Sequence, residues 1–133
     1  MPIWLEAAEI KHFHRELIAE HGGLAGLRDE GALESTLARP QSLLHYLPTT
    51  TIAELAACYG FGFAQNHVFT DGNKRIALTS INVFLQINGA TLTASELEAV
   101  HVVLELAAGR SDQAALAAWI AQNSEPYDLD AGI

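Results

Sequence analysis

The nine residues HVFTDGNKR, at positions 67–75, combine side chains that suit phosphoryl or nucleotidyl transfer. Histidine exchanges protons readily near neutral pH, so His67 can act as a general base or acid. Asp71 supplies a carboxylate, which suits a Mg²⁺ held jointly by one protein oxygen and the phosphates of a nucleotide. Phe69 is apolar between polar neighbours, and we expect it to anchor the segment in the core.

The end of the same segment suits the binding of an anion. Gly72 permits backbone angles that point successive amides at a phosphate, and Asn73 can donate a side-chain hydrogen bond. Lys74 and Arg75 supply positive charge, the arginine as a bidentate fork. We therefore predict that Gly72, Asn73, Lys74 and Arg75 bind phosphate. The spacing alone also fits a simpler structure, a capped helix start with His67 on the surface.

The charge of the whole chain makes a Lys-Arg pair unusual. The chain has 133 residues, of which 16 are acidic and 7 are basic, and its formal net charge is −9. Such a protein repels nucleic acids and anionic membranes, so we expect no direct binding to either. The pair at 74–75 then favours one small anion, although two solvated residues at a helix start would have the same pattern.

The composition predicts one domain over residues 1–133. Half of the residues are apolar, which is enough to bury a core. No apolar run approaches the roughly 20 residues of a membrane-spanning helix. Glu6 and Glu9 stand where an export signal would be basic and then apolar, so we expect no such signal. Cys58 is the only cysteine, which excludes an internal disulfide and fits a cytoplasmic protein.

The elements that must position the segment are all predicted to be helices, giving an all-α bundle of about six. The expected ranges are 3–20, 29–37, 51–66, 73–87, 93–108 and 111–122. Pro40 should close the second helix and leave 41–50 as a loop or flap with Tyr46 and Leu47 exposed. A short hairpin within 41–51 is the only strand structure we expect, and the tail from Ser124 should be frayed.

Particular residues mark the ends and the packing of these helices. Capping boxes at 51–54 and 93–96 open the third and fifth helices, and Ser111 should cap the sixth. Gly60 and Gly62 inside the third helix favour close packing. The fourth helix has almost no polar face, so we expect it to be buried centrally. Its N-terminus then offers free amides and a favourable dipole for a phosphate at the loop 67–72.

The run HVFTDGNKR resembles the signature of the Fic/Doc family, which reads His-x-Phe-x-(Asp/Glu)-x-Asn-(Gly/Lys)-Arg. The residues in register are His67, Phe69, Asp71, Asn73 and Arg75. Two further stretches, GGLAGLRDEGALESTLARP at 22–40 and NVFLQINGATL at 82–92, are similar to the Doc, or death-on-curing, branch. The resemblance covers roughly residues 5–120 and implies the helical Fic fold.

The resemblance also bears on the reaction. Fic proteins that transfer AMP have Gly-Asn-Gly-Arg and a second arginine three positions later, whereas this chain has Lys74 and then Leu78. At both positions the chain resembles the Doc-type toxins. These proteins transfer the γ-phosphate of ATP to a threonine of elongation factor Tu and stop translation. A lysine fills room that glycine leaves for phosphates, so we expect the nucleotide to lie differently.

Carried over by position, the resemblance implies a Ser/Thr protein kinase that uses ATP and Mg²⁺. His67, Asp71 and Arg75 would be catalytic: His67 takes the proton from the target hydroxyl, and Asp71 holds Mg²⁺. Asn73, Lys74 and Arg75 would bind the phosphates beside Gly72, and the 41–51 stretch would be a flap that holds the target.

The resemblance implies restraint by a Phd-like antitoxin in trans. A self-inhibitory Ser/Thr-x-x-x-Glu-(Gly/Asn) motif is absent, because the one Glu before Gly or Asn is Glu30, and Gly26 stands four residues earlier. Two alternatives stay open for the function, an AMP transferase of the Fic type and a catalytically inactive binding or regulatory module.

Overall fold

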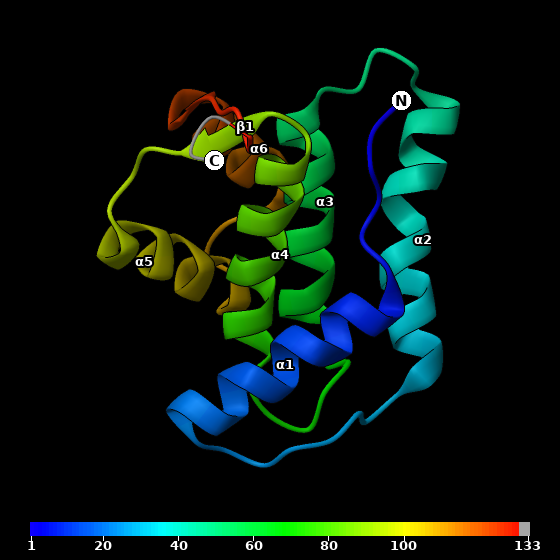
Figure 1. Cartoon of the computed structure of the whole chain (residues 1–133), viewed down its shortest axis with the longest axis vertical. Coiled ribbons are helices and arrows are strands. Elements are labelled where there is room, and N and C mark those ends of the chain that lie inside the picture. The colour runs from blue at the N-terminus through cyan, green and yellow to red at the C-terminus, as the bar shows by residue number, and fades with distance from the viewer. Residues whose placement is uncertain (131–133) are drawn as a thin grey trace.

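A computed structural model describes residues 1–130 of the chain, and in this part the fold is built mainly from helices (Figure 1). The elements are α1 (Ala7–His21), α2 (Glu30–Tyr46), α3 (Ile52–Gln65), α4 (Asn73–Ile87), β1 (Ala90–Leu92), α5 (Glu96–Ala107), α6 (Gln113–Gln122) and β2 (Ser124–Pro126). The predicted all-α fold of about six helices is confirmed. Residues 131–133 of the predicted 1–133 domain lie outside the described residues.

Helix α3 forms the centre of the core. Every residue from Leu55 to Ala64 is buried except Phe61. Figure 1 shows α3 and α4 side by side, with α2 along one flank and α1 crossing the ends of the helices that lie near loop 67–72. The prediction that α4 is buried centrally holds in part, because α4 packs against α1, α3, α5 and β1, but α3 is the more completely buried helix and one face of α4 lines a cleft.

The uncovered side of α4 is polar. Thr79, Asn82 and Gln86 are half-buried and line a cleft, whereas Ile76, Ile81 and the neighbouring apolar residues pack into the core. The three polar residues are spaced three and four apart, which places them on one helix face. A helix that reads as apolar in composition thus presents a polar stripe to the cleft.

Gly60 lets α3 approach its neighbours closely. A Cβ at this position would lie 2.5 Å from Ile81 Cδ1 and 3.3 Å from Leu116 Cδ2. At Gly62 a Cβ would lie 2.8 Å from Thr36 Cγ2. The close packing predicted for both glycines is confirmed.

Substituting Gly60 by alanine should destabilise the protein. Overpacking a filled core costs about 1–3 kcal/mol, which exceeds the gain of up to about 1 kcal/mol in helix propensity. We expect a lower denaturation midpoint for Gly60→Ala and little change for Gly31→Ala, since a Cβ at Gly31 meets only Asp29 Oδ1, at 3.4 Å. Equal midpoints for Gly60→Ala and wild type would contradict the packing shown here.

Pro40 does not end α2, which continues to Tyr46. A proline removes one backbone hydrogen bond, but Leu43 and Leu44 in the following turn pack against the core and stabilise the continued helix. The predicted end at Leu37 and the predicted hairpin were therefore wrong. Tyr46 and Leu47 are 80% and 57% exposed, as predicted.

The loop after α2 lies far from the loop 67–72. The two loops flank α3, whose 14 residues separate them by about 20 Å at 1.5 Å per residue. Figure 1 shows them at opposite ends of that helix. The flap assigned to 41–51 is thus mostly helix and does not border the segment 67–75.

Helix ends follow the predictions only in part. The capping box of α3 is present, with Thr51 and Glu54 exchanging hydrogen bonds of 3.1 and 2.9 Å. Helix α5 is instead capped by Ser95, because the Thr93 amide donates to the Asn123 carbonyl at 2.7 Å and keeps the chain extended. Asp112, rather than Ser111, caps α6.

The two strands were not predicted. β1 and β2 pair antiparallel, with Ala90 opposite Pro126 and Leu92 opposite Ser124. This pairing holds the segment after α6 against the end of α4, so the expected fraying from Ser124 is wrong for these residues. At the other end of the chain, α1 begins at Ala7 rather than at residue 3. Among the described residues, no helix has the length and apolarity needed to cross a membrane.

Candidate active site

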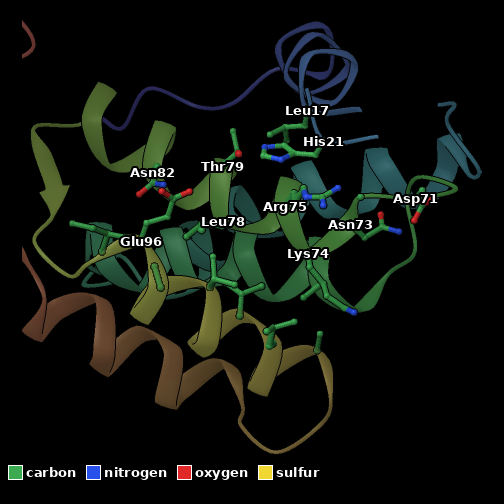
Figure 2. Close-up of a pocket in the computed structure, with 18 of the residues that line it drawn as sticks. Leu17, His21, Asp71, Asn73, Lys74, Arg75, Leu78, Thr79, Asn82 and Glu96 are labelled. Atoms are coloured by element: carbon green, nitrogen blue, oxygen red, sulfur yellow. The ribbon is translucent and has the colours of Figure 1, made fainter. Parts of the chain in front are cut away.

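A cleft of about 1020 Å³ lies between α1, α4 and α5, with the loop 67–72 at one end (Figure 2). Its lining includes His67 and every residue from Thr70 to Arg75. Figure 2 shows Lys74 and Arg75 beside the cavity, with Leu17 and His21 of α1 on the opposite side from α5. The predicted site residues are therefore brought together at one end of a single cleft.

His67 stands where α3 gives way to the loop. Its φ is +48°, in the left-handed region that few residues other than glycine adopt. The His67 carbonyl accepts a hydrogen bond of 3.1 Å from Arg28 Nη1, which helps to hold this conformation. The residue is exposed, so its imidazole is accessible to a substrate in the cleft.

The segment 22–29 runs alongside the loop and holds it by backbone hydrogen bonds. The Thr70 amide donates to Gly26 at 3.1 Å, and the amides of Arg28 and Asp29 donate to Val68 at 2.9 and 3.1 Å. An isolated β-bridge joins this segment to the loop between residues 27 and 69. Segment 22–29 therefore holds the loop 67–72 in place, which the sequence did not indicate.

Asp71 has one oriented and one accessible carboxylate oxygen. The Leu24 amide donates to Oδ2 at 3.1 Å, and a Cβ on Gly23 would lie only 3.0 Å from the same oxygen. No hydrogen bond to Oδ1 is seen within residues 1–130, and the residue is exposed. One hard oxygen is thus available to a ligand.

This donor set fits Mg²⁺ bound together with a nucleotide. Over residues 1–130 there is no cluster of three or more His, Cys, Asp or Glu side chains that could hold a metal alone. Mg²⁺ commonly takes one or two carboxylates, with its other ligands coming from phosphates and water. Asp71, at the edge of a cleft that also contains Lys74, Arg75 and the free amides of α4, matches that pattern.

The N-terminus of α4 is open to the cleft. Gly72 precedes the helix with φ +78°, and no side chain caps the first turn. The amides of Asn73, Lys74 and Arg75 have no partners inside the helix, because the first turn lacks acceptors. A phosphate placed here would meet free N–H groups and the positive end of the helix dipole.

Asn73 has a local role in this structure. Its Oδ1 accepts from the Phe69 amide at 3.0 Å, and its Nδ2 donates to the Phe69 carbonyl at 2.9 Å. Both ends of the side-chain amide thus close the loop. The contact of Asn73 with a phosphate stays a prediction.

Phe69 anchors the loop, as predicted. The residue is 2% exposed, and its ring stacks on the ring of His14 with centroids 3.7 Å apart and planes inclined by 7°. His14 also lies 2.7 Å, through Nε2, from the carbonyl oxygen of Asp71. His14 was not identified from the sequence as part of the site. The available signal was its position four residues after buried Ile10, on the covered face of α1.

Lys74 and Arg75 are the cations of the site. Both are exposed, and no carboxylate lies within ion-pair distance of either within the described residues. Their charge is therefore not neutralised locally in a protein of net charge −9. An anionic ligand would supply the missing partner.

The remainder of the cleft differs in character. The polar stripe of Thr79, Asn82 and Gln86 lies on α4, and α5 contributes an apolar wall with Val100 and Val103. Figure 2 shows Glu96 of α5 beside Asn82. The cleft thus extends well beyond the cationic end, and the sequence did not indicate this extension.

Comparison with known proteins agrees with the predicted resemblance. Residues 4–85, from the segment before α1 almost to the end of α4, match the model of the Fic/DOC family. The chain belongs to the Fic/Doc family.

Two curated relatives are similar over part of the chain. "Protein kinase doc" of Escherichia phage P1 is 38% identical over 81 residues, which cover 61% of this chain and 64% of that protein. "Toxin Doc" of Mycolicibacterium smegmatis (strain ATCC 700084 / mc(2)155) is 38% identical over 74 residues, covering 55% of this chain and 57% of that protein. The similar region thus spans less than two thirds of either relative.

Proposed function

We propose that this protein is a Doc-like toxin, a protein kinase that transfers the γ-phosphate of ATP to a Ser or Thr hydroxyl of a translation factor. The observation that carries the proposal is the convergence of His67, Asp71 and the uncapped start of α4 at one end of a cleft. The names of the two relatives, one a kinase and one a toxin, support the same function. Elongation factor Tu is the target we expect.

His67 supplies the proton transfer in this reaction. Its imidazole takes the proton from the target hydroxyl as the oxygen bonds to the γ-phosphorus. The bond between that phosphorus and the β,γ-bridging oxygen breaks, and the products are ADP and a phosphorylated protein. The exposed position of His67 beside the cleft gives a protein substrate access to it.

The start of α4 supplies the charge stabilisation. Phosphoryl transfer depends mainly on positioning and on stabilising negative charge. Lys74 and Arg75, together with the free amides of the first turn, bind and orient the phosphates. Asp71 would hold Mg²⁺, and the metal would neutralise charge on the nucleotide.

Restraint of the toxin would come from another protein. We propose a Phd-like antitoxin that binds in trans and a site of action in the cytoplasm, where ATP and the translation factor are present. Co-expression with a Phd-like antitoxin should relieve toxicity and yield a stable complex on purification. Unrelieved toxicity would contradict this part of the proposal.

Lys74 is proposed to select the phosphate that is transferred. Its side chain occupies space at the start of α4 that a glycine would leave for phosphates. We expect Lys74→Gly to slow transfer of the γ-phosphate and to allow some transfer of AMP. Mass spectrometry of the product distinguishes the two groups. A slower reaction that still transfers only phosphate would contradict a selecting role, and Lys11→Gly, a change at a cation outside the cleft, serves as control.

Intact-mass spectrometry tests the proposed function. The purified chain is incubated with ATP, Mg²⁺ and elongation factor Tu, and the modified residue is mapped. A mass gain of one phosphoryl group on a Thr or Ser supports the proposal. A gain of one AMP would make the protein an AMP transferase, and an unmodified factor with toxicity that survives loss of His67 would indicate a binding module.

A further inference from the structure

A buried histidine from a distant part of the chain holds the functional loop. His14 is 2% exposed and lies on α1, 57 residues before its hydrogen-bond partner Asp71. Because a carbonyl oxygen can only accept, Nε2 of His14 is the donor in this 2.7 Å hydrogen bond. The same ring stacks on Phe69, so one side chain contacts both the anchor of the loop and its last turn.

We propose that His14 is a positioning residue for phosphoryl transfer, and this inference rests on the function proposed above. It acts by fixing the backbone between the metal-binding carboxylate and the start of α4. A residue in this role would touch neither nucleotide nor target.

The planarity of the peptide bond explains how this works. In a trans peptide the C=O and N–H of one unit point in opposite directions. Holding the Asp71 carbonyl towards α1 therefore points the Gly72 amide away from α1. This peptide leads directly into the left-handed conformation of Gly72 that precedes the uncapped helix. The hydrogen bond thus fixes the orientation of the peptide that precedes the free amides at the start of α4.

The space around Gly72 is consistent with such a fixed arrangement. A Cβ at this residue would lie 3.3 Å from Ile18 Cδ1 and 3.5 Å from Nε2 of His14. The loop therefore packs directly on the face of α1 that carries the histidine. Small changes in this contact would move Asp71 and Lys74 together.

Packing alone does not require a histidine here. A phenylalanine would also place a ring against Phe69 and would avoid placing a polar nitrogen in the interior. The nitrogen is accommodated because it meets the Asp71 carbonyl, whose direction matters for the site. The two contributions of His14, ring and donor, can therefore be separated by substitution.

Three substitutions make this separation. His14→Phe keeps a ring and loses the donor, His14→Gln keeps an N–H at about the reach of Nε2 and loses the ring, and His14→Ala loses both. The same changes at His12 are matched controls, because His12 is on the same helix, is largely exposed and contacts Glu16 rather than the loop 67–72. Each variant is assayed for kcat, for KM of ATP and for melting temperature.

We expect His14→Phe to melt within a few degrees of wild type yet to lose about 10- to 100-fold in kcat, because a small misplacement of reacting groups has effects of this size. His14→Gln should recover most of kcat although it is less stable, and the His12 variants should resemble wild type. Wild-type kcat in His14→Phe would overturn the proposal. The proposal would also be overturned if kcat fell in proportion to melting temperature across the variants, with His14→Gln losing as much kcat as His14→Ala.

A second readout separates this proposal from the function on which it rests. If wild type transfers no phosphate, the proposed function fails, and ¹H–¹⁵N spectra without nucleotide then decide the role of His14. Amide signals of residues 68–74 should shift and broaden in His14→Phe, whereas those of α6 should not. An unchanged loop spectrum in His14→Phe would overturn the positioning role.

Discussion

His67→Asn should lower phosphate transfer about a hundredfold to ten-thousandfold, the range for loss of a general base, with little change in melting temperature. Asparagine cannot take the proton from the hydroxyl, but it tolerates the left-handed backbone that His67 adopts at φ +48°. Alanine would remove the base and add backbone strain, so asparagine isolates the chemistry better. Initial rates of ³²P transfer measure the effect.

His101→Asn is the matched control for this change. His101 is also exposed, and it lies on α5 at 4.0 Å from Glu105 rather than in the cleft. The His101→Asn variant should transfer phosphate at the wild-type rate. Retention of most of the activity in His67→Asn would remove His67 from the chemistry, and full toxicity of that variant in cells would favour a binding module.

Asp71→Asn is expected to have the second-largest effect. Asparagine keeps an oxygen that can accept from the Leu24 amide, so the loop should be retained, but it removes the negative charge that we propose holds Mg²⁺. Loss of one such electrostatic group typically costs about 10²- to 10³-fold in rate. Transfer should therefore fall by this amount, and the Mg²⁺ concentration that gives half of the maximal rate should rise.

A titration of the rate with Mg²⁺ measures both quantities. Glu20→Gln is the control, because it removes one negative charge from an exposed residue of α1 that does not line the cleft. Its Mg²⁺ dependence should match wild type. An unchanged Mg²⁺ dependence in Asp71→Asn would show that this carboxylate does not hold the metal.

The sequence predicts the site well where residues are close in the chain. His67, Asp71 and Arg75 fall within nine residues that also form one loop and one helix start, so their convergence follows from local structure. The capping box at 51–54 is likewise local, and both the box and the start of α3 are confirmed.

Contacts between residues far apart in the chain could not be predicted from the sequence. The hydrogen bond between His14 and Asp71 spans 57 residues. The backbone hydrogen bonds between segment 22–29 and the loop 67–72 likewise join parts of the chain that are far apart in the sequence. Thr93 looks like a helix cap, but its amide is bound to Asn123, so α5 starts later. In each case a partner far away in the chain decided between locally equivalent conformations.

The burial of the helices was misjudged for a related reason. Composition alone makes α4 look apolar, yet the cleft beside it leaves Thr79, Asn82 and Gln86 facing open space. Pro40 suggested a helix end, but tertiary packing of the next turn outweighed the lost hydrogen bond. Local signals describe preferences, whereas packing decides which are realised.

The most direct test of the proposed kinase is a pair of labelling reactions. The purified chain is incubated with Mg²⁺, elongation factor Tu and ATP labelled at the γ-phosphate, and the reaction is repeated with an α-phosphate label and with His67→Asn. Label transferred from the γ position only, and lost in the variant, is the expected result. Label transferred from the α position, or γ label transferred equally by His67→Asn, would contradict it.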